Sequence, residues 1–341
     1  MRKRVTSTDI ARRIGVSRTT VSFVLNNVPG VAVETRARVL EAAKKLGYVP
    51  NSAARMLVSG RSYTLGLIIS RADLLCVDAF IPQLIYGIGG VCNERGYKLL
   101  VESVEGTSNA DAYLDLVYGK RIDALMIVNP QRNDKGLLKL VEMRFPVVSL
   151  GSLHHTLENS VSVDDVAGAR AATEHLISLG HRRIAYIGYA PLSYLAATAR
   201  FAGYKKALRE QKISVDRKLI ASANFSSESG FHAMKRIIGL NTDVTAVFIS
   251  NDTVALGAMA AIREAGLTVP DDIAVVGFDD LPFSSYTNPP LTTIQSDPAG
   301  LGEFAARAAL KLLDGERVGV QRNVVPLKLV VRESCGARSS N

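Results

Sequence analysis

A short segment near the N-terminus presents a row of side chains that can form hydrogen bonds or apolar contacts with a partner. They recur at helical spacing on one face of residues 18–26: Arg18, Thr19, Ser22, Phe23 and Asn26. An arginine can donate two hydrogen bonds to a guanine, a hydroxyl can bond to a base or a phosphate, and an aromatic ring can pack on a thymine methyl. The segment therefore predicts a helix whose outer face could read bases in a DNA groove.

The neighbouring residues predict the elements that hold this helix. Thr6 stands three residues before Asp9, which is capping-box spacing, and Gly15 favours a tight turn before Ser17, which can cap the second helix. A third helix is expected over residues 33–46, ended by Gly47, with four residues facing inward: Val39, Leu40, Ala43 and Leu46. Three short helices with a glycine turn between the first two form a helix-turn-helix. The alternative is a small helical packing module with a solvated polar face.

The positive charge of the chain is concentrated in the same part. Residues 1–62 contain 12 Lys and Arg against 3 Asp and Glu, whereas residues 63–341 contain 29 of each. A basic domain joined to a neutral one indicates a polyanionic partner for the first part only.

The sequence carries no pattern for a membrane, a secretory signal or a metal. No apolar run is long enough to span a bilayer, and no apolar segment follows the charged residues 1–4. The three cysteines are widely spaced and fit neither a disulfide framework nor a zinc site. We therefore expect a cytoplasmic protein without a metal or a membrane partner.

Residues 51–62 predict a hinge. Asn51 can cap a short helix over residues 52–57, but so short a helix is marginal alone because helix nucleation is unfavourable. We expect it to form only against a partner helix or on DNA. Residues 59–62, Ser-Gly-Arg-Ser, are typical of a flexible linker.

From residue 63 onward, short apolar runs alternate with helical patterns. The expected strands are 64–70, 98–101, 124–128, 147–150, 184–187, 246–249 and 274–276, with helices such as 80–95, 166–179 and 253–265 between most of them. This pattern predicts a parallel α/β arrangement, long enough for two successive sheets with a cleft between them. Ligands in such folds bind beyond the carboxyl ends of the strands, where Ser70, Asn251 and Asp279 are expected. Asx residues there could equally cap the following helices, and Asp252 fits a cap better than a ligand contact.

A long, ungapped motif runs through the first 57 residues. It includes Val5-Thr6, Asp9-Ile10-Ala11, Gly15-Val16-Ser17, Thr20-Val21-Ser22, Leu25-Asn26, Leu46-Gly47-Tyr48, Pro50-Asn51, Ala54-Arg55 and Leu57. This motif resembles the headpiece of the LacI/GalR family of bacterial repressors. The resemblance implies a hinge helix that pairs across a homodimer and enters the minor groove, where Leu57 wedges into the central base step. It adds to the DNA-binding set Thr6, Ser17, Thr20, Tyr48, Asn51, Ala54, Arg55 and Leu57.

Two positions depart from the family pattern. Ala32 stands where a capping serine is usual, a loss of about 1 kcal/mol of helix stability. Phe23 stands where a polar or basic base-reading residue is common, so the operator sequence does not carry over from a relative.

Further motifs extend the resemblance over almost the whole chain: Leu179-Gly180-His181, Arg200-Phe201-Ala202-Gly203-Tyr204, Ser250-Asn251-Asp252 and Val276-Gly277-Phe278-Asp279-Asp280. They imply a periplasmic-binding-protein-like core of two subdomains, 63–160 with 291–320 and 161–290 with 321–332. In relatives, residues matching Arg200, Asn251 and Asp279 bind the effector, and an aromatic residue matching Phe225 stacks on it. Phe80 and Ser70 match positions in the cleft.

Together these features predict an α/β protein with an all-α helix-turn-helix domain over residues 1–50, a hinge over 51–62 and an effector-binding core over 63–341. We expect a transcriptional repressor that binds operator DNA and responds to a small molecule, either a sugar or a nucleoside- or purine-like metabolite. The tail after Arg332 has no leucine heptads, which favours a homodimer over a tail-joined tetramer. No catalytic set is evident, so we expect neither enzymatic activity nor a cofactor. The alternatives are a solute-binding protein of a transporter and an enzyme with a DNA-binding appendage. Whether the effector releases DNA or promotes binding stays open.

Overall fold

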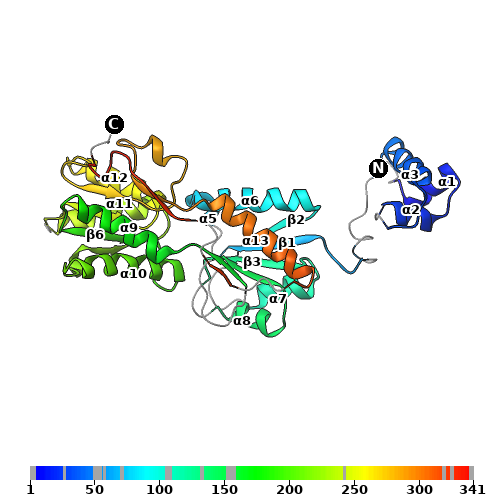
Figure 1. Ribbon diagram of the computed structural model, residues 1–341, viewed down its shortest axis with the longest axis horizontal. Coiled ribbons are helices and arrows are strands. Elements are labelled where there is room, and N and C mark those ends of the chain that lie inside the picture. Colours follow the sequence, from blue (N-terminus) through cyan, green and yellow to red (C-terminus); the bar gives the residue numbers. More distant parts are fainter. Residues whose placement is uncertain are drawn as a thin grey trace. The chain divides into compact units, whose positions relative to one another are not determined.

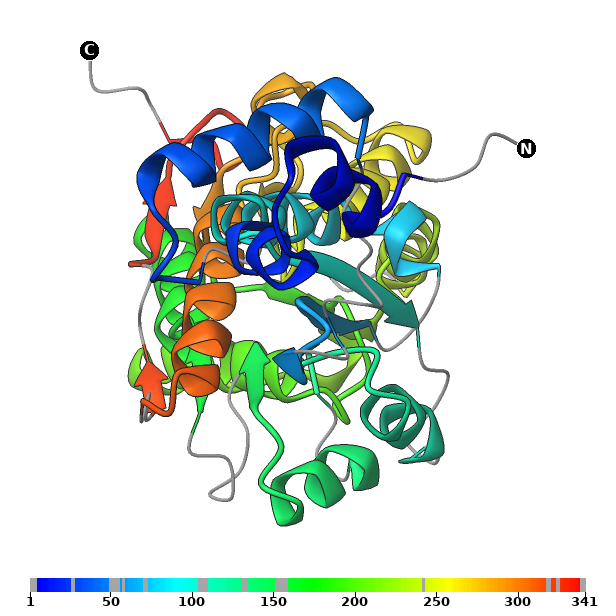
Figure 2. The same cartoon turned by 90° about the vertical axis from the view of Figure 1, so that its right-hand side faces the viewer.

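The computed structural model describes residues 5–25, 28–48, 56, 59–69, 73–103, 110–130, 134–150, 159–240, 243–316, 320–322 and 326–337. Contacts divide the chain into two units between Tyr63 and Thr64. Figure 1 and Figure 2 show a helical first unit and an α/β second unit. The predicted mixed α/β class is confirmed.

The first unit consists of three helices: α1 (Ser7–Ile14), α2 (Arg18–Leu25) and α3 (Val33–Leu46). Thr6 caps α1 in the expected capping box, because its hydroxyl accepts from Asp9 N and the Asp9 side chain accepts from Thr6 N at 2.9 Å. Gly15 ends α1 with φ 71°, a conformation that glycine adopts without strain. The Ser17 hydroxyl accepts from Thr20 N at 3.0 Å and so caps α2. α3 starts at Ala32 with no side-chain cap.

The three helices bury a common apolar core, formed by Ile10, Ala11, Val21, Val24, Val39, Ala42 and Ala43. One expected core residue is wrong: Leu40 is 50 % exposed, and Ala42 is buried instead. The inward face of α3 follows the i, i+3, i+4, i+7 spacing from Val39 to Leu46, and Leu40 falls outside that spacing. The prediction therefore placed one residue too many on a narrow helix face.

The second unit contains two parallel sheets. The first has the strand order β11-β5-β4-β3-β1-β2, made of β1 (Thr64–Ile69), β2 (Lys98–Ser103), β3 (Ala124–Val128), β4 (Val147–Leu150), β5 (Ser160–Ser162) and β11 (Val320–Arg322). The second has the order β7-β6-β8-β9, made of β6 (Ile184–Gly188), β7 (Ile220–Ser222), β8 (Ala246–Ile249) and β9 (Ala274–Val276). An antiparallel pair, β10 (Thr293–Gln295) with β12 (Lys328–Val330), continues the second sheet through bridges to Val276 and Asp279.

Helices cover both sheets in packed pairs, as Figure 1 shows. On the first sheet α6 (Phe80–Arg95) packs against α13 (Pro298–Leu313), accompanied by α5 (Leu74–Val77), α7 (Ala110–Tyr118) and α8 (Lys135–Glu142). On the second sheet α9 (Asp165–Ser178) packs against α10 (Leu195–Glu210), and α11 (Ser227–Gly239) packs against α12 (Asp252–Glu264). Two short 3-10 helices, η1 (Arg217–Leu219) and η2 (Ser284–Tyr286), complete this subdomain. The close packing of α6 against α13 requires glycine at position 87, because a side chain there would collide with the carbonyl of Ala299.

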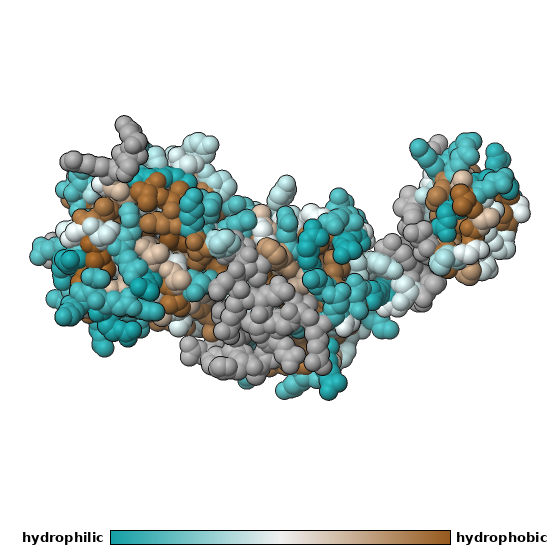
Figure 3. Space-filling model, in the orientation of Figure 1, coloured by the Kyte–Doolittle hydropathy of each residue, from teal (hydrophilic) through white to brown (hydrophobic). Residues whose placement is uncertain are grey.

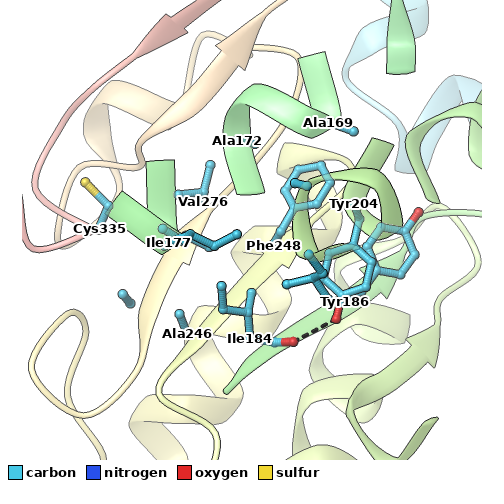
Figure 4. Close-up of a cluster of buried hydrophobic side chains, with 14 of the residues drawn as sticks. Ala169, Ala172, Ile177, Ile184, Tyr186, Tyr204, Ala246, Phe248, Val276 and Cys335 are labelled. Atoms are coloured by element: carbon cyan, nitrogen blue, oxygen red, sulfur yellow. Dashed lines mark hydrogen bonds between the residues drawn. The ribbon is translucent and has the colours of Figure 1, made fainter. Parts of the chain in front are cut away.

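An apolar cluster supports the second sheet (Figure 4). Ile184, Tyr186, Phe248 and Val276 of the strands pack against Ala169, Ala172 and Ile177 of α9 and Tyr204 of α10, and each of these residues is at most 7 % exposed. Strands of a parallel sheet are covered on both faces, which explains why they are continuous apolar runs in the sequence.

The chain crosses between the two sheets three times. β5 belongs to the first sheet and α9 to the second, so the first crossing lies near residue 163. β10 pairs with β12, so the second crossing lies near residue 296, and β11 pairs with β5, so the third follows residue 322. These positions fall a few residues after the boundaries of 160, 290 and 320 that the resemblance implies.

Among the described residues no helix is both long enough and apolar enough to cross a bilayer. On the face drawn in Figure 3, hydrophilic residues surround smaller apolar areas in both units.

Candidate functional site

The outer face of α2 carries the residues expected to contact bases. Arg18, Thr19 and Phe23 are exposed, and Ser22 is half-buried. Val21 and Val24 are buried on the opposite face. The helix therefore has an apolar inner face and an outer face with hydrogen-bonding groups, as docking in a major groove requires. DNA contact by these four residues stays a prediction.

Four further residues of the predicted DNA-binding set also stabilise the headpiece itself: Thr6, Ser17, Thr20 and Tyr48. Thr6 caps α1, and Ser17 caps α2 while its hydroxyl lies 2.8 Å from the hydroxyl of Thr20. Tyr48 is half-buried against the headpiece core. A hydroxyl group can both donate and accept, so these caps leave capacity for a phosphate contact. The remaining predicted residues lie outside the described part of the chain: Asn26, Asn51, Ala54, Arg55 and Leu57.

Arg200, on α10, is the centre of a buried polar cluster in the second unit. Its Nε donates to Asp165 Oδ1 at 2.7 Å, and its Nη1 donates to the Ser250 carbonyl at 2.6 Å. Its Nη2 donates to Asp279 Oδ1 at 3.2 Å. The guanidinium carbon lies 3.7 Å from the centroid of the Phe278 ring. The partners stand at the N-terminus of α9 and just after β8 and β9, which is where parallel sheets place ligands.

Asp279 extends this cluster. Its Oδ2 accepts from Asn251 Nδ2 at 2.8 Å, and its Oδ1 accepts from Ser296 Oγ at 3.2 Å. The backbone of Asp279 has φ 113°, and that of Phe225 has φ 65°. Such conformations are strained by about 1–3 kcal/mol in residues other than glycine and persist where neighbours hold them, often at functional sites. The side-chain bonds from Arg200, Asn251 and Ser296 supply that restraint for Asp279.

Asn251 has one of the two roles that the sequence left open, whereas Asp252 differs from its expected role. Asn251 caps α12, since its Oδ1 accepts from Thr253 N at 2.9 Å, and its amide still reaches Asp279. The expectation that Asp252 is a cap is wrong. Asp252 is fully buried in the first turn of α12, where its carboxylate accepts from the hydroxyls of Ser284 and Thr293 at 2.7 Å each. Asp252 therefore joins α12 to η2 and β10.

Asp78 faces the cluster from the first subdomain, and sequence analysis did not single it out. It lies between α5 and α6, is 4 % exposed, and accepts from Phe80 N at 3.1 Å. Burial raises the pKa of Asp78 to about 7, and the negative charge of Asp279 adds to that rise. The Phe80 amide, Arg200 and Asn251 act in the opposite direction. Asp78 thus belongs to one subdomain, and charged residues of the other subdomain change its pKa.

Asp165 was also missed, although a signal for it exists. It is the second acid of the pair Asp164-Asp165, in which Asp164 caps α9 through Ala167 N at 2.9 Å. One aspartate is enough for a cap, so the second needs another role. Its role is the ion pair with Arg200.

The cluster borders a small cavity between the two subdomains. The cavity has a volume of about 30 Å³ and is lined by Phe80, Val128 and Leu150 from the first subdomain and by Asp165, Ala196 and Arg200 from the second. This volume holds a water molecule or two, whereas pockets for small organic ligands start near 300 Å³. A second hollow of about 250 Å³ reaches Asp279 between Gln83, Asp280, Gln295 and Asp297. Neither space, as the described residues outline it, reaches the size of a small-molecule site, so a bound effector would require the subdomains to separate.

Four of the predicted effector residues come together here: Phe80, Arg200, Asn251 and Asp279. Phe225 is separated from Arg200 by the ring of Tyr189. Phe225 is 1 % exposed, and the rings of Tyr189 and Tyr194 meet it edge-on at 5.5 and 5.3 Å. The Tyr189 ring in turn lies 5.0 Å from the Arg200 guanidinium. Ser70 lies outside the described residues.

Two family models match the chain in the two units just described. A model of bacterial regulatory proteins, lacI family, matches residues 6–51, and a model of a periplasmic binding protein-like domain matches residues 173–335.

Curated relatives are similar over nearly the whole length. The HTH-type transcriptional regulator CelR of Thermobifida fusca is 34% identical over 337 residues, which cover 98% of this chain and 99% of the relative. The HTH-type transcriptional repressor PurR of Histophilus somni (strain 129Pt) is 33% identical over 334 residues, which cover 96% of this chain and 97% of the relative.

Solved structures share the fold. The lac repressor dimer bound to operator and the anti-inducer ONPF is 33% identical, with a TM-score of 0.87 over 98% of this chain and 100% of that chain. A complex of CelR with cellobiose is 32% identical, with a TM-score of 0.75 over 97% of this chain and 100% of that chain. The helix-turn-helix unit, the two-sheet core and the full-length relatives agree, and the chain belongs to the lacI family of bacterial regulatory proteins.

Proposed function

We propose that this chain represses transcription by binding operator DNA through its N-terminal unit, and that a small, neutral, hydroxyl-rich molecule in the cleft sets its operator affinity. The buried cluster of Arg200, Asp279 and Asn251 carries the proposal, because it brings polar groups to the carboxyl ends of β8 and β9.

The charge balance of the cluster favours a neutral effector over an anion. Burial by itself lowers the pKa of Arg200, but Asp279 and Asp165 outweigh it and raise that pKa, so the guanidinium stays charged and paired. One cation thus faces two carboxylates, with Asp78 on the opposite side. A phosphate or carboxylate would be repelled by these acids, whereas the hydroxyl groups of a sugar can donate to them.

The aromatic residues favour a sugar over a purine. A purine base would need the face of Phe225 for stacking, but Phe225 is buried and held by Tyr189 and Tyr194. The solved CelR complex contains cellobiose, which is a neutral sugar. A purine-like effector is the second candidate, and it would require these rings to rearrange.

We propose a homodimer as the DNA-binding form. The lac repressor was solved as a dimer on its operator, and two-fold symmetry places one helix-turn-helix on each half-site. The excess of basic residues before residue 63 would supply contacts to phosphates. The protein would act in the cytoplasm, by binding and not by catalysis.

The small size of the cavity indicates how effector binding would change operator binding. Admitting a ligand requires a hinge motion at the three crossings between the sheets. β1 begins at Thr64, directly after the linker, so movement of the first subdomain would be passed to residues 51–62. In a dimer this motion would change the spacing of the two hinge segments and favour or oppose their folding on DNA.

A thermal-shift screen of sugars, sugar alcohols, nucleosides, purines and sugar phosphates tests the proposal. A ligand present at 100 times its dissociation constant should stabilise the fold by about 2.7 kcal/mol. Arg200→Ala and Asp279→Ala should lose this shift and keep operator binding. Arg307→Ala is the matched control, because Arg307 is an exposed arginine paired with Glu94. Binding of sugar phosphates alone, or a full shift in both cleft variants, would contradict the proposal.

A further inference from the structure

Two spaces lie next to each other along the gap between the subdomains. One is the cavity at Arg200, which we call the inner cavity, and the other is the hollow that reaches Asp279, which we call the outer hollow. Phe80 of α6 lines the inner cavity. Gln83, three residues later on the same helix face, lines the outer hollow. One face of α6 therefore borders both spaces.

The segment after β10 separates the two spaces. Ser296 is buried and lines the inner cavity, whereas its neighbours Gln295 and Asp297 are exposed and line the outer hollow. Adjacent side chains of an extended segment point to opposite sides, as those of Gln295 and Ser296 do. The Ser296 hydroxyl donates to Asp279 Oδ1 at 3.2 Å, so this bond stands between the two spaces.

Separation of the subdomains would join the two spaces. Phe80 and Gln83 belong to the first subdomain, whereas Arg200 and Asp279 belong to the second. A motion that takes α6 away from β9 therefore widens both spaces together and leaves one continuous groove. The outer hollow alone, at about 250 Å³, is smaller than the roughly 300 Å³ at which sites for small organic molecules start. Its size suits one part of a ligand.

The outer hollow offers hydrogen bonds and no aromatic surface. Of its described lining residues only Pro298 is apolar. Gln83 Nε2 donates to the Ala79 carbonyl at 3.3 Å, which holds the amide and leaves its oxygen as an acceptor. Asp297 Oδ1 caps α13 by accepting from Gly300 N at 2.9 Å, and Oδ2 can accept from a ligand hydroxyl. A unit with several hydroxyl groups fits this lining, whereas a nucleobase would find no ring to stack on.

The outer hollow does not require a cationic ligand, although three aspartates line it. Asp279 is paired with Arg200, and Asp280 is paired with Arg332 at 2.7 Å. Asp297 lies at the N-terminus of α13, where the helix dipole favours a negative charge. Groups within the chain thus balance these acids, and a neutral unit can bind here.

We propose that the effector is a disaccharide and that its second sugar ring binds in the outer hollow. This inference rests on the proposed function, because it places the first ring at the cluster of Arg200, Asn251 and Asp279. The second ring donates hydroxyl protons to Gln83 Oε1 and Asp297 Oδ2, so these two residues select the second ring and its linkage. A monosaccharide occupies the inner position only and makes neither bond.

Calorimetric titration of the full-length protein compares glucose and galactose with cellobiose, lactose, maltose, sucrose and trehalose. We expect at least one disaccharide to bind about ten times as tightly as either monosaccharide. Gln83→Ala should weaken that disaccharide about fivefold and leave monosaccharide binding unchanged, because it removes one neutral hydrogen bond to the second ring. Asp297→Asn keeps an oxygen for Gly300 N but loses the second acceptor, and it should have a similar effect. Glu303→Gln is the matched control, because Glu303 is an exposed residue of α13 that lines neither space.

The possible outcomes separate this inference from the proposed function. Equal affinity for monosaccharides and disaccharides would overturn the site for a second ring and keep a sugar as the effector. Wild-type affinity for the disaccharide in both Gln83→Ala and Asp297→Asn, or equal weakening in Glu303→Gln, would do the same. Binding of none of these sugars would overturn both the inference and the proposed sugar effector.

Discussion

Protonation of Asp78 should control how easily the cleft closes. In the closed arrangement Asp78 is 4 % exposed and its pKa is about 7, whereas an aspartate in water has a pKa of about 4. Opening the cleft would return this carboxyl group to water and move it away from Asp279. The closed state then holds the proton more tightly, so closure takes up a proton between about pH 4 and about pH 7.

The sign and size of the effect follow from this shift. Closure is strongest at the acid end of this window, and effector affinity is weakest there, because a bound effector requires the subdomains to separate. As pH rises toward about 7, closure weakens and effector affinity increases, and both are constant above that value, because Asp78 is then ionised in both states. A shift of about three pKa units corresponds to at most about 4 kcal/mol, and the affinity can change by at most about tenfold per pH unit. Entry of water into the cleft would reduce both figures.

Effector titration by calorimetry from about pH 5 to about pH 8 measures this dependence. Asp78→Asn keeps an oxygen that can accept from Phe80 N but cannot ionise, so this variant should bind equally well across the range. Asp252 serves as the comparison. Burial also raises its pKa to about 7, but its partners Leu281, Ser284 and Thr293 lie in the same subdomain and do not depend on closure. A flat profile for the wild type, or the same slope in Asp78→Asn, would refute the reasoning.

Three further predictions concern DNA binding. Arg18→Ala should lose discrimination at one guanine position, a loss of about 1–3 kcal/mol if the contact is bidentate, and selection from random DNA would show an unchanged site if Arg18 makes no base contact. Operator affinity should fall steeply with salt, and a fragment that starts near Ser62 should keep effector binding without operator binding; native operator affinity of that fragment would disprove the role of the headpiece. Leu57→Ala should weaken specific binding and reduce DNA bending in an electrophoretic phasing assay while effector affinity stays nearly intact; wild-type bending by this variant would exclude the wedge.

Local signals explain why most elements could be predicted. The caps at Thr6, Gly15 and Gly47 depend on a few neighbouring residues, so they can be read from the sequence. Seven strands could be predicted because they are continuous apolar runs, which result from helices covering both faces of their sheets. The strands β5, β7, β10, β11 and β12 were not predicted. Each has three residues, and pairs such as Val320 with Ser160 are set by contacts between distant parts of the chain.

The candidate site was partly predictable for a similar reason. Asn251 and Asp279 follow recognisable strands, and Arg200 stands in a motif of the family. Asp78 and Ser296 have no such marker, because only the folded chain shows that they face Arg200 and Asp279. Asp165 is marked only as the second acid of a pair whose first member caps α9.

The central claim is that occupancy of the cleft sets operator affinity, and a linked binding cycle tests it most directly. Operator dissociation constants would be measured by fluorescence anisotropy with and without saturating effector, and effector constants by calorimetry with and without operator. The two ratios must be equal if the sites are coupled, and a coupling of 1–3 kcal/mol would make each ratio about 5 to 150. We predict equal ratios in this range for the wild type. Asp279→Ala should have the same operator dissociation constant with and without effector, because this variant loses effector binding. An effector that binds the wild type in the cleft and leaves operator affinity unchanged would contradict the account.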